Sequence, residues 1–326
     1  MPRVTVVVAS YQSERYIARA IESVLGQTLK DVEVVVKDDA STDGTVRIAE
    51  SFARQGVRVC ASTPRMGAVA SFNSGIAAAT APLVVKLDAD DWLLPEHLAE
   101  CERVLSLNPD CAFVFTQAYS YQEGKVAGLY PDWWREDKVL DGRSFLLSVL
   151  KDRNPCASNT VMFRKSAFTQ AGGFKDRGVF FPYGEDLDLW LRLSAQGSVA
   201  YLARPLAAYT ARDCGLTAKL DSPLNRRQLR ALAEAIDEIT VSAVKSGVLH
   251  QEDWPAVARL LVRQWTRTAD ACAFLPDDWR YCLGRAWKLS PLATVRTRAF
   301  WRLMVKLALG LRRTEAVRAR GKPSTP

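Results

Sequence analysis

The sequence predicts an α/β fold in which a mostly parallel β-sheet is covered by helices on both faces. Three observations favour this class. Strand-like and helix-like segments alternate through the first half, acidic clusters follow two of the strands, and the 326 residues are 48% hydrophobic and 25% charged. The alternation is typical of βαβ units, and the composition is that of an ordinary globular protein.

The segments of the first half follow one another in a regular order. Runs rich in β-branched residues predict strands, at Val4–Ala9, Val32–Val36, Val57–Ala61, Leu83–Leu87 and Ala112–Thr116. Apolar residues at helical spacing predict helices between them, at Ser13–Gly26, Thr45–Arg54, Ala68–Ala79 and Pro95–Leu107.

The pattern is less regular beyond this point. The stretch Lys125–Asp141 is aromatic and irregular, and its Trp133–Trp134 pair fits an acceptor platform as well as ordinary packing. A strand "NTVMF", a helix "RKSAFTQAGGF" and a helix "YGEDLDLWLRLSAQG" follow, the last with acids in its first turn, where they suit the helix dipole. We expect an α/β domain over residues 1–220 and an appended helical region over residues 221–326.

The composition bears on compartment and cofactors. Seven cysteines without a CxxC pair indicate reduced thiols, and two histidines are too few for a histidine-rich metal site. The first run, "VTVVVAS", lacks the features of a signal peptide, and no uncharged apolar run reaches the ~18 residues that span a bilayer. We therefore expect a cytoplasmic protein.

Acidic residues follow the second and fourth strands: Asp38 and Asp39, then Asp88, Asp90 and Asp91. Because ligands of open α/β sheets bind outside the carboxyl ends of the strands, these carboxylates should share one crevice. Asp88 and Asp90 could hold Mg²⁺ or Mn²⁺, which prefer oxygen ligands. A solvated turn before the next helix would explain the same spacing.

Longer stretches carry a resemblance to a known family. The runs "VTVVVASYQSERYIARAIESVLGQTLKDVEVVVKDDASTDGT" and "SFNSGIAAATAPLVVKLDADDWLLPEHL" resemble family 2 glycosyltransferases of the GT-A fold. With "GGF" and "GEDLDLWLRL", the resemblance covers about residues 3–205. It implies an inverting, metal-dependent hexosyltransferase that moves a sugar from a nucleotide-diphosphate donor, a UDP-sugar above others, to an acceptor hydroxyl.

The resemblance also implies residue roles on the donor side. The donor-binding residues it implies are Ala9, Tyr11, Glu14, Asp39, Arg65, Asn73, Lys86 and Asp88. Tyr11 would pack near the base, and Asp39 would accept a hydrogen bond from a uracil-type base. Asp90 would be the main metal ligand, with Asp88 beside it. Taken singly, Tyr11 could simply pack, and Asp39 could be a turn residue.

On the acceptor side, the resemblance implies that Asp186 is the general base and that Glu185 orients the acceptor. Gly172 and Gly173 would form a tight turn over the donor sugar. Each has a simpler explanation. Acids in the first turn of a helix stabilise it by ~0.3–1 kcal/mol, and a glycine pair ends many helices.

One donor-side stretch departs from the family pattern. Many relatives carry N-x-G and then R-N where this chain has "TPRMGAVASFNSG". Arg65 therefore replaces the first Asn and Phe72 replaces the Arg, while Asn73 is kept. Arg65 or Lys86 would then have to supply positive charge toward the diphosphate.

The net charge of +8 is concentrated near the C-terminal end, where residues 281–326 contain eleven Lys or Arg and a single acid. Residues 291–322 alternate cations with bulky apolar side chains around Trp301, which suits an anionic membrane surface. The acceptor would then be a lipid-linked or growing surface saccharide, at the inner face of the cytoplasmic membrane. A helix packed on the catalytic domain would show the same pattern, and no motif favours nucleic acid.

Two other functions compete with transfer of a sugar. A sugar nucleotidyltransferase shares the α/β layout, but it should carry a glycine- and arginine-rich loop after the first strand, where this chain has "SYQSERY". A non-catalytic nucleotide-sugar-binding scaffold has no need of both Asp90 and Asp186. We therefore favour the transferase.

Overall fold

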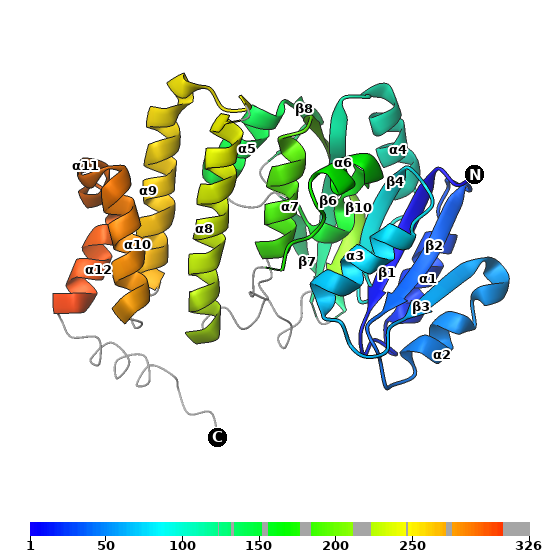
Figure 1. Cartoon of the computed structure of the whole chain (residues 1–326). Coiled ribbons are helices and arrows are strands. Elements are labelled where there is room, and N and C mark those ends of the chain that lie inside the picture. Colours follow the sequence, from blue (N-terminus) through cyan, green and yellow to red (C-terminus); the bar gives the residue numbers. More distant parts are fainter. Residues whose placement is uncertain are drawn as a thin grey trace. The chain divides into compact units, whose positions relative to one another are not determined.

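The computed structural model describes residues 1–122, 124–131, 134–151, 156–176, 184–210, 223–245, 247–271 and 276–308. The chain divides into two compact units, and Figure 1 draws their elements. The first unit is Met1–Gly178 with Pro182–Ala218, and the second is Lys219–Pro326 with Val179–Phe181. The first unit is mixed α/β and the second is helical, as the sequence predicts.

The described residues of the first unit form one ten-stranded sheet. Its strands are β1 (Val4–Ser10), β2 (Val32–Asp38), β3 (Val57–Ala61), β4 (Leu83–Asp88), β5 (Trp92–Leu93), β6 (Cys111–Gln122), β7 (Lys125–Tyr130), β8 (Lys138–Leu140), β9 (Met162–Arg164) and β10 (Ser198–Thr210). The order is β3-β2-β1-β4-β9-β6-β10-β5, with β7 paired to β6 and β8 to β10. The first four strands of this order are parallel, whereas β9 runs antiparallel to β4 and β6.

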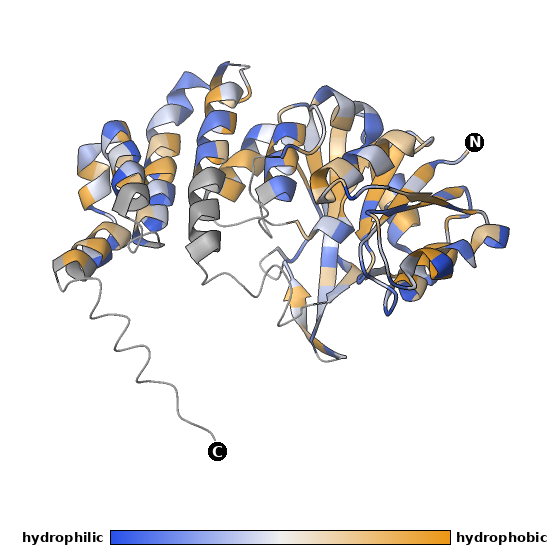
Figure 2. Cartoon of the chain, turned by 60° about the horizontal axis from the view of Figure 1, so that its bottom comes forward, coloured by the Kyte–Doolittle hydropathy of each residue, from blue (hydrophilic) through white to orange (hydrophobic). Residues whose placement is uncertain are grey.

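Helices follow most of these strands. They are α1 (Ile17–Leu25), α2 (Thr45–Glu50), α3 (Ala68–Ala78), α4 (His97–Leu107), α5 (Gly142–Lys151), α6 (Lys165–Gln170) and α7 (Gly184–Ser194). Short 3₁₀ turns lie at Ala53–Gln55 and Ser158–Thr160. The strands stand out as hydrophobic in Figure 2, as expected for strands that are covered on both faces.

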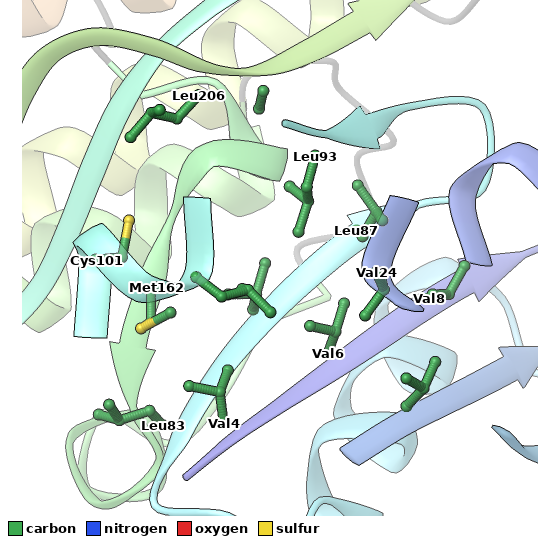
Figure 3. Close-up of a cluster of buried hydrophobic side chains, with 14 of the residues drawn as sticks. Val4, Val6, Val8, Val24, Leu83, Leu87, Leu93, Cys101, Met162 and Leu206 are labelled. Carbon is green, nitrogen blue, oxygen red and sulfur yellow. The ribbon is translucent and has the colours of Figure 1, made fainter. Parts of the chain in front are cut away.

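An aliphatic layer lies between one face of the sheet and helices α1, α2 and α4. Val4, Val6 and Val8 alternate along β1 into this layer, and Figure 3 shows them with Val24 of α1 and Cys101 of α4. A fully buried aliphatic side chain stabilises the fold by about 1.5–3 kcal/mol. A one-residue slip of β1 would turn these valines away from the layer, so the layer fixes the register of the strand.

The opposite face of the sheet carries an aromatic layer. Phe113 of β6 and Phe163 of β9 contact Trp190 of α7, with ring centroids 5.7 and 6.2 Å from it. Phe145 of α5 lies 5.4 Å from Phe113, and Phe168 of α6 lies 5.3 Å from Phe163. This layer fixes α7 on the sheet, although α7 follows β4 by almost a hundred residues.

The structure corrects two expectations. The stretch Lys125–Asp141 contains strands β7 and β8 instead of being irregular throughout. β7 is exposed along most of its length and pairs with β6, so it lacks the alternation that marks a half-buried strand. The helix expected at Thr45–Arg54 ends at Glu50, and a 3₁₀ turn follows it.

The second unit consists of helices that pack around α9. They are α8 (Pro223–Lys245), α9 (Trp254–Ala271), α10 (Pro276–Leu289), α11 (Pro291–Val295) and α12 (Arg298–Ala308). Val257, Leu261 and Trp265 of α9 are fully buried. Within the described ranges, no helix is long and apolar enough to cross a membrane.

Helix α3 lies so close to the sheet that Gly75 has no room for a side chain. A Cβ at this position would come 2.7 Å from Val7 Cγ1 and 3.0 Å from Lys37 Cβ. We predict that Gly75→Ala destabilises the first unit by about 1–3 kcal/mol, the usual cost of overpacking. Chemical denaturation would measure this.

The matched control is Gly128→Ala on β7, where a Cβ would meet no atom within 4 Å. The control should change the free energy of unfolding by less than about 0.5 kcal/mol. Equal stability of the two variants would contradict the close packing of α3.

Candidate active site

The carboxyl ends of β1, β2 and β4 lie side by side because the three strands are parallel neighbours. Ser10 of β1 pairs with Asp38 of β2, and Ala9 of β1 pairs with Asp88 of β4. The backbone N–H of Ala89 donates to the Ala9 carbonyl at 3.0 Å, which continues the pairing into the acidic turn. The sheet therefore brings both predicted acidic clusters to one edge.

Asp38 fixes the loop that follows β2. Its buried carboxylate accepts hydrogen bonds from the Ser10 hydroxyl (2.9 Å) and from the backbone N–H (2.8 Å) and hydroxyl (2.6 Å) of Ser41. Ala40 has a φ of 63°, in the left-handed region that only glycine adopts freely. These contacts fix the turn after β2, and so they fix the position of Asp39, the first residue after the strand.

Asp39 anchors the loop that leads into α3. Its two carboxylate oxygens accept the backbone N–H groups of Met66 (2.7 Å) and Gly67 (3.0 Å), and Arg65 Nε lies 3.5 Å away. The Asp39 side chain is only 5% exposed. These contacts already occupy both of its oxygens, a role that the sequence did not indicate.

Tyr11 and Arg65 meet at the surface beside Asp39. The Arg65 guanidinium lies 3.9 Å from the centroid of the Tyr11 ring, a cation–π distance. Tyr11 is 42% exposed, which is high for a large aromatic side chain. An exposed ring with a stacked guanidinium can accept a flat ligand such as a nucleobase.

Glu14 and Asn73 are occupied by contacts with other loops. Glu14 Oε2 accepts the backbone N–H of Gly44 at 2.9 Å. Asn73 donates to the Phe174 carbonyl at 2.8 Å and accepts the Phe174 N–H at 2.9 Å, so it fastens α3 to the turn that contains Gly173. Both residues therefore fasten neighbouring segments of the chain to each other.

Three carboxylates crowd the turn after β4. Asp88 is 34% exposed, and Asp91 is buried and accepts the backbone N–H of Thr210 at 2.9 Å. The backbone carbonyl of Asp90 accepts hydrogen bonds from Arg19 and Thr210, both at 2.7 Å. Burial, and then the charges of Asp90 and Asp88, raise the pKa of Asp91 well above its usual value. The three acids therefore lie close enough to repel one another.

Lys86 brings two distant parts of the chain together. Its ammonium lies 3.2 Å from the carboxylate of Asp88 and 3.9 Å from that of Asp186 on α7. The side chain is 3% exposed. Burial lowers the pKa of Lys86, but the charges of Asp186 and Asp88 outweigh it, so the pKa lies above its usual value.

Glu185 and Asp186 begin α7 as two largely buried acids. Burial, and then the charge of Asp186, raise the pKa of Glu185 to about 8. Burial also raises the pKa of Asp186, and the Lys86 ammonium opposes this rise. Glu185 Oε2 and Asp186 Oδ1 have no hydrogen-bond partner among the described residues. Both oxygens are buried, and Asp186 Oδ1 faces the Lys86 ammonium at 3.9 Å.

Other residues near the site have packing roles. Trp190 of α7 is fully buried in the aromatic layer. Arg192 forms an ion pair with Asp188 and donates to the Ala171 carbonyl at 2.6 Å, which fastens α7 to the end of α6. Trp134 packs against Tyr201, with ring centroids 5.2 Å apart. Trp133 lies outside the described residues.

The acidic turn fits a divalent ion only partly. No group of three His, Cys, Asp or Glu side chains is close enough to hold a metal in the described part of the chain. Mg²⁺ often takes one or two protein carboxylates and completes its shell with phosphate oxygens and water. A divalent ion bound at this turn would offset the repulsion among Asp88, Asp90 and Asp91.

Comparisons with known proteins show the family and the fold of the chain. The family model for glycosyl transferase family 2 matches residues 5–169, which include Asp39, Asp88 and Asp90 but end before Asp186. EpsE of Bacillus subtilis (strain 168), a protein named as a glycosyltransferase, is 27% identical over 82% of this chain and 91% of its own length.

Two solved structures share the fold. TarS 1-349 of S. aureus, in complex with UDP-GlcNAc, superposes with a TM-score of 0.61 at 18% identity, over 90% of each chain. The mannosyltransferase PcManGT of Pyrobaculum calidifontis, in complex with GDP-Man and Mn²⁺, gives 0.52 at 20% identity, over 94% of this chain and 86% of its own.

The pKa of Glu185 gives a prediction about stability. In the folded protein this pKa is about 8, against an ordinary 4.5, so folding retains a proton between these two pH values. The contribution of Glu185 to stability should therefore fall as the pH rises from 4.5 to 8. Glu185→Gln should remove that part of the pH dependence, which at about 1.36 kcal/mol per pKa unit amounts to at most about 5 kcal/mol.

Urea unfolding at pH 5 and pH 8.5, in buffer with a chelator, would measure the effect. The control is Glu96→Gln, at an exposed position. A pH dependence that is the same in wild type and Glu185→Gln would contradict the burial of a protonated Glu185.

Proposed function

Because the chain belongs to glycosyl transferase family 2, we propose that it transfers a sugar with inversion, from a nucleotide-diphosphate donor to an acceptor hydroxyl. The observation that carries the proposal is the meeting of Asp88 and Asp186 at Lys86. Transfer with inversion needs a donor site and a base within one crevice, and these two carboxylates come from the two parts of the chain that would supply them.

The donor nucleotide would bind along the carboxyl edge of β1 and β2. Tyr11 offers a ring face to the base, and Arg65 offers positive charge beside it. Asp39 would contact the base only if it shared its oxygens with the loop that it already anchors. A uracil base, and so a UDP-sugar, is our proposal. The comparison structures contain UDP-GlcNAc in one case and GDP-Man in the other.

Asp90 and Asp88 would hold Mg²⁺ or Mn²⁺ together with the phosphates of the donor. The ion would neutralise the charge that develops on the departing nucleoside diphosphate. Lys86 is too buried to replace the ion at the phosphates. Arg65 is an exposed cation that lies beside Tyr11 at the predicted base site.

Asp186 would accept the proton of the acceptor hydroxyl. The acceptor oxygen forms a bond to the anomeric carbon as the bond from that carbon to the phosphate oxygen breaks, and the proton passes to Asp186 Oδ1. In the described structure this oxygen has no hydrogen-bond partner and lies 3.9 Å from the Lys86 ammonium. A general base acts when the acceptor hydroxyl comes within hydrogen-bond reach of it. Glu185, next to it, would orient the acceptor.

The acceptor would be a lipid-linked or growing saccharide, presented at an anionic membrane surface. In the second unit, Trp287, Leu292 and Trp301 are exposed by 49, 59 and 61%, and Arg298 and Arg302 are exposed near Trp301. Exposed tryptophans among cations suit the interface of an anionic membrane.

The structure changes which residues would meet the lipid. The sequence offered the apolar face of α12, but Ala299 and Leu303 on this face are buried, and α12 packs against α9. Arg302 forms an ion pair with Asp270 of α9 at 3.3 Å. The exposed tryptophans, rather than the apolar side chains of α12 that face α9, would therefore enter the interface.

We predict separate effects for the base and the metal ligand. Asp186→Asn should lower kcat by about 10²–10⁴-fold, the usual contribution of a general base, and should leave UDP affinity in Mn²⁺ nearly unchanged. Asp90→Ala should lose the increase in melting temperature that UDP gives with Mn²⁺. Sugar-transfer assays and thermal shift would measure the two effects.

The control for both variants is Asp110→Asn, at an exposed position before β6. It should behave as wild type in each assay. Full activity of both Asp186→Asn and Asp90→Ala would contradict the roles proposed for these two residues.

We also predict that the second unit binds anionic lipid. Trp301→Ser with Arg302→Ser should weaken binding to phosphatidylglycerol liposomes at least ~10-fold, since each cation near such a surface contributes about 1 kcal/mol and the tryptophan adds to this. Flotation at 50 and 500 mM salt would measure it.

Leu107→Ser with Arg103→Ser removes one exposed apolar residue and one exposed cation from the first unit, and is the matched control. Equal flotation of the two double variants would contradict docking through α12.

A further inference from the structure

We propose that Lys86 is a positioning residue, which fixes the carboxylate of Asp186 on α7 relative to Asp88 on β4. The inference rests on the proposed function, because that function assigns Asp186 to the acceptor and Asp88 to the donor. The inference adds that Lys86, a residue of strand β4, sets the distance between Asp186 and Asp88. The resemblance implied a different role for Lys86, as part of the donor site.

The burial of Lys86 argues against direct contact with the donor. Its side chain is 3% exposed, whereas that of Asp88, two residues later, is 34% exposed. Lys86 pairs with Val7 of β1, within the parallel part of the sheet. A diphosphate in the crevice would meet Asp88 before it could reach the ammonium.

The surroundings of Lys86 fix where its ammonium can lie. The ammonium is 4.1 Å from the centroid of the Phe72 ring on α3 and 6.0 Å from that of Phe174. Ring faces attract cations and exclude water. The backbone of Phe174 is in turn fastened to Asn73 by two hydrogen bonds, so this wall is held in place. The ammonium thus has one open direction, toward the carboxylates.

Lys86 is the cation that faces Asp186 in the described structure, with its ammonium 3.9 Å from Asp186 Oδ1. The Ser158 hydroxyl, which also lowers the pKa of Asp186, carries no charge. The neighbouring cation of α7, Arg192, is committed to Asp188. Without Lys86, the carboxylates of Asp88 and Asp186 would lie near each other without a counter-charge, and repulsion would move Asp186 away.

The first test compares Lys86→Met, which keeps the unbranched stem, with Lys86→Arg, which keeps the charge. Lys86→Met should lower kcat about 100-fold, as expected for a misplaced catalytic group, while the Kd of UDP with Mn²⁺ changes less than about threefold. Lys86→Arg should keep more than about a tenth of wild-type kcat, since charge and approximate position survive.

Two kinetic results would overturn the proposal. An unchanged kcat in Lys86→Met would show that the ammonium is not needed. A weaker UDP affinity with unchanged kcat would show that Lys86 serves the donor directly.

If Lys86→Met does not fold, the exchange variant Lys86→Phe with Phe72→Lys tests the same proposal. It swaps two side chains in contact, so it keeps the total volume and returns an ammonium to the same carboxylates from α3. It should keep kcat above about a tenth of wild type, within the range that a preserved orientation allows. A folded exchange variant without turnover would overturn the proposal.

Crystal structures of the wild type and Lys86→Met decide the question independently of activity. The wild type should show Lys86 Nζ within about 4 Å of Asp186, the limit of an ion pair, and Asp186 should move in Lys86→Met. An Asp186 that stays in place would overturn the positioning role. A wild type that transfers no sugar from any donor would overturn the proposed function instead, and the crystal structures would still decide the role of Lys86.

Discussion

The arrangement of the site depends on one positive charge buried among carboxylates. Transfer of charged groups out of water is costly, and a buried acid normally becomes protonated unless a partner offsets the cost. The Lys86 ammonium is that partner, because it lies 3.2 Å from Asp88 and 3.9 Å from Asp186. It allows a strand end and a helix start, almost a hundred residues apart in sequence, to present acids to the same crevice.

The rest of the first unit supports this contact. The parallel order of β2, β1 and β4 brings three strand ends to one edge, and the aromatic layer fixes α7 on the same face of the sheet as Lys86. The loops around the crevice are tied by side chains, Asp39 to the loop before α3 and Asn73 to the turn at Phe174. The site is therefore shaped before any ligand binds, which lowers the entropic cost of binding.

The sequence predicted those parts of the structure that local patterns encode. The strands β1 to β4 and the helices between them were predicted, with a different end for α2, because β-branched runs and helical apolar spacing mark them. The exposed β7 and the late strand β10 carry no such local signal. Motif positions indicated which residues gather at the site, but not their contacts. The Lys86–Asp186 ion pair and the burial of the α12 apolar face against α9 depend on tertiary packing, which one sequence does not reveal.

A crystal structure with UDP and Mn²⁺ bound tests the central claim most directly. The account predicts Mn²⁺ within about 2.3 Å of a carboxylate oxygen of Asp90 or Asp88, the range for hard cations with oxygen ligands. It also predicts that Lys86 remains between Asp88 and Asp186, away from the phosphates. Mn²⁺ bound by other residues, or Lys86 turned onto the diphosphate with Asp186 outside the crevice, would contradict the account.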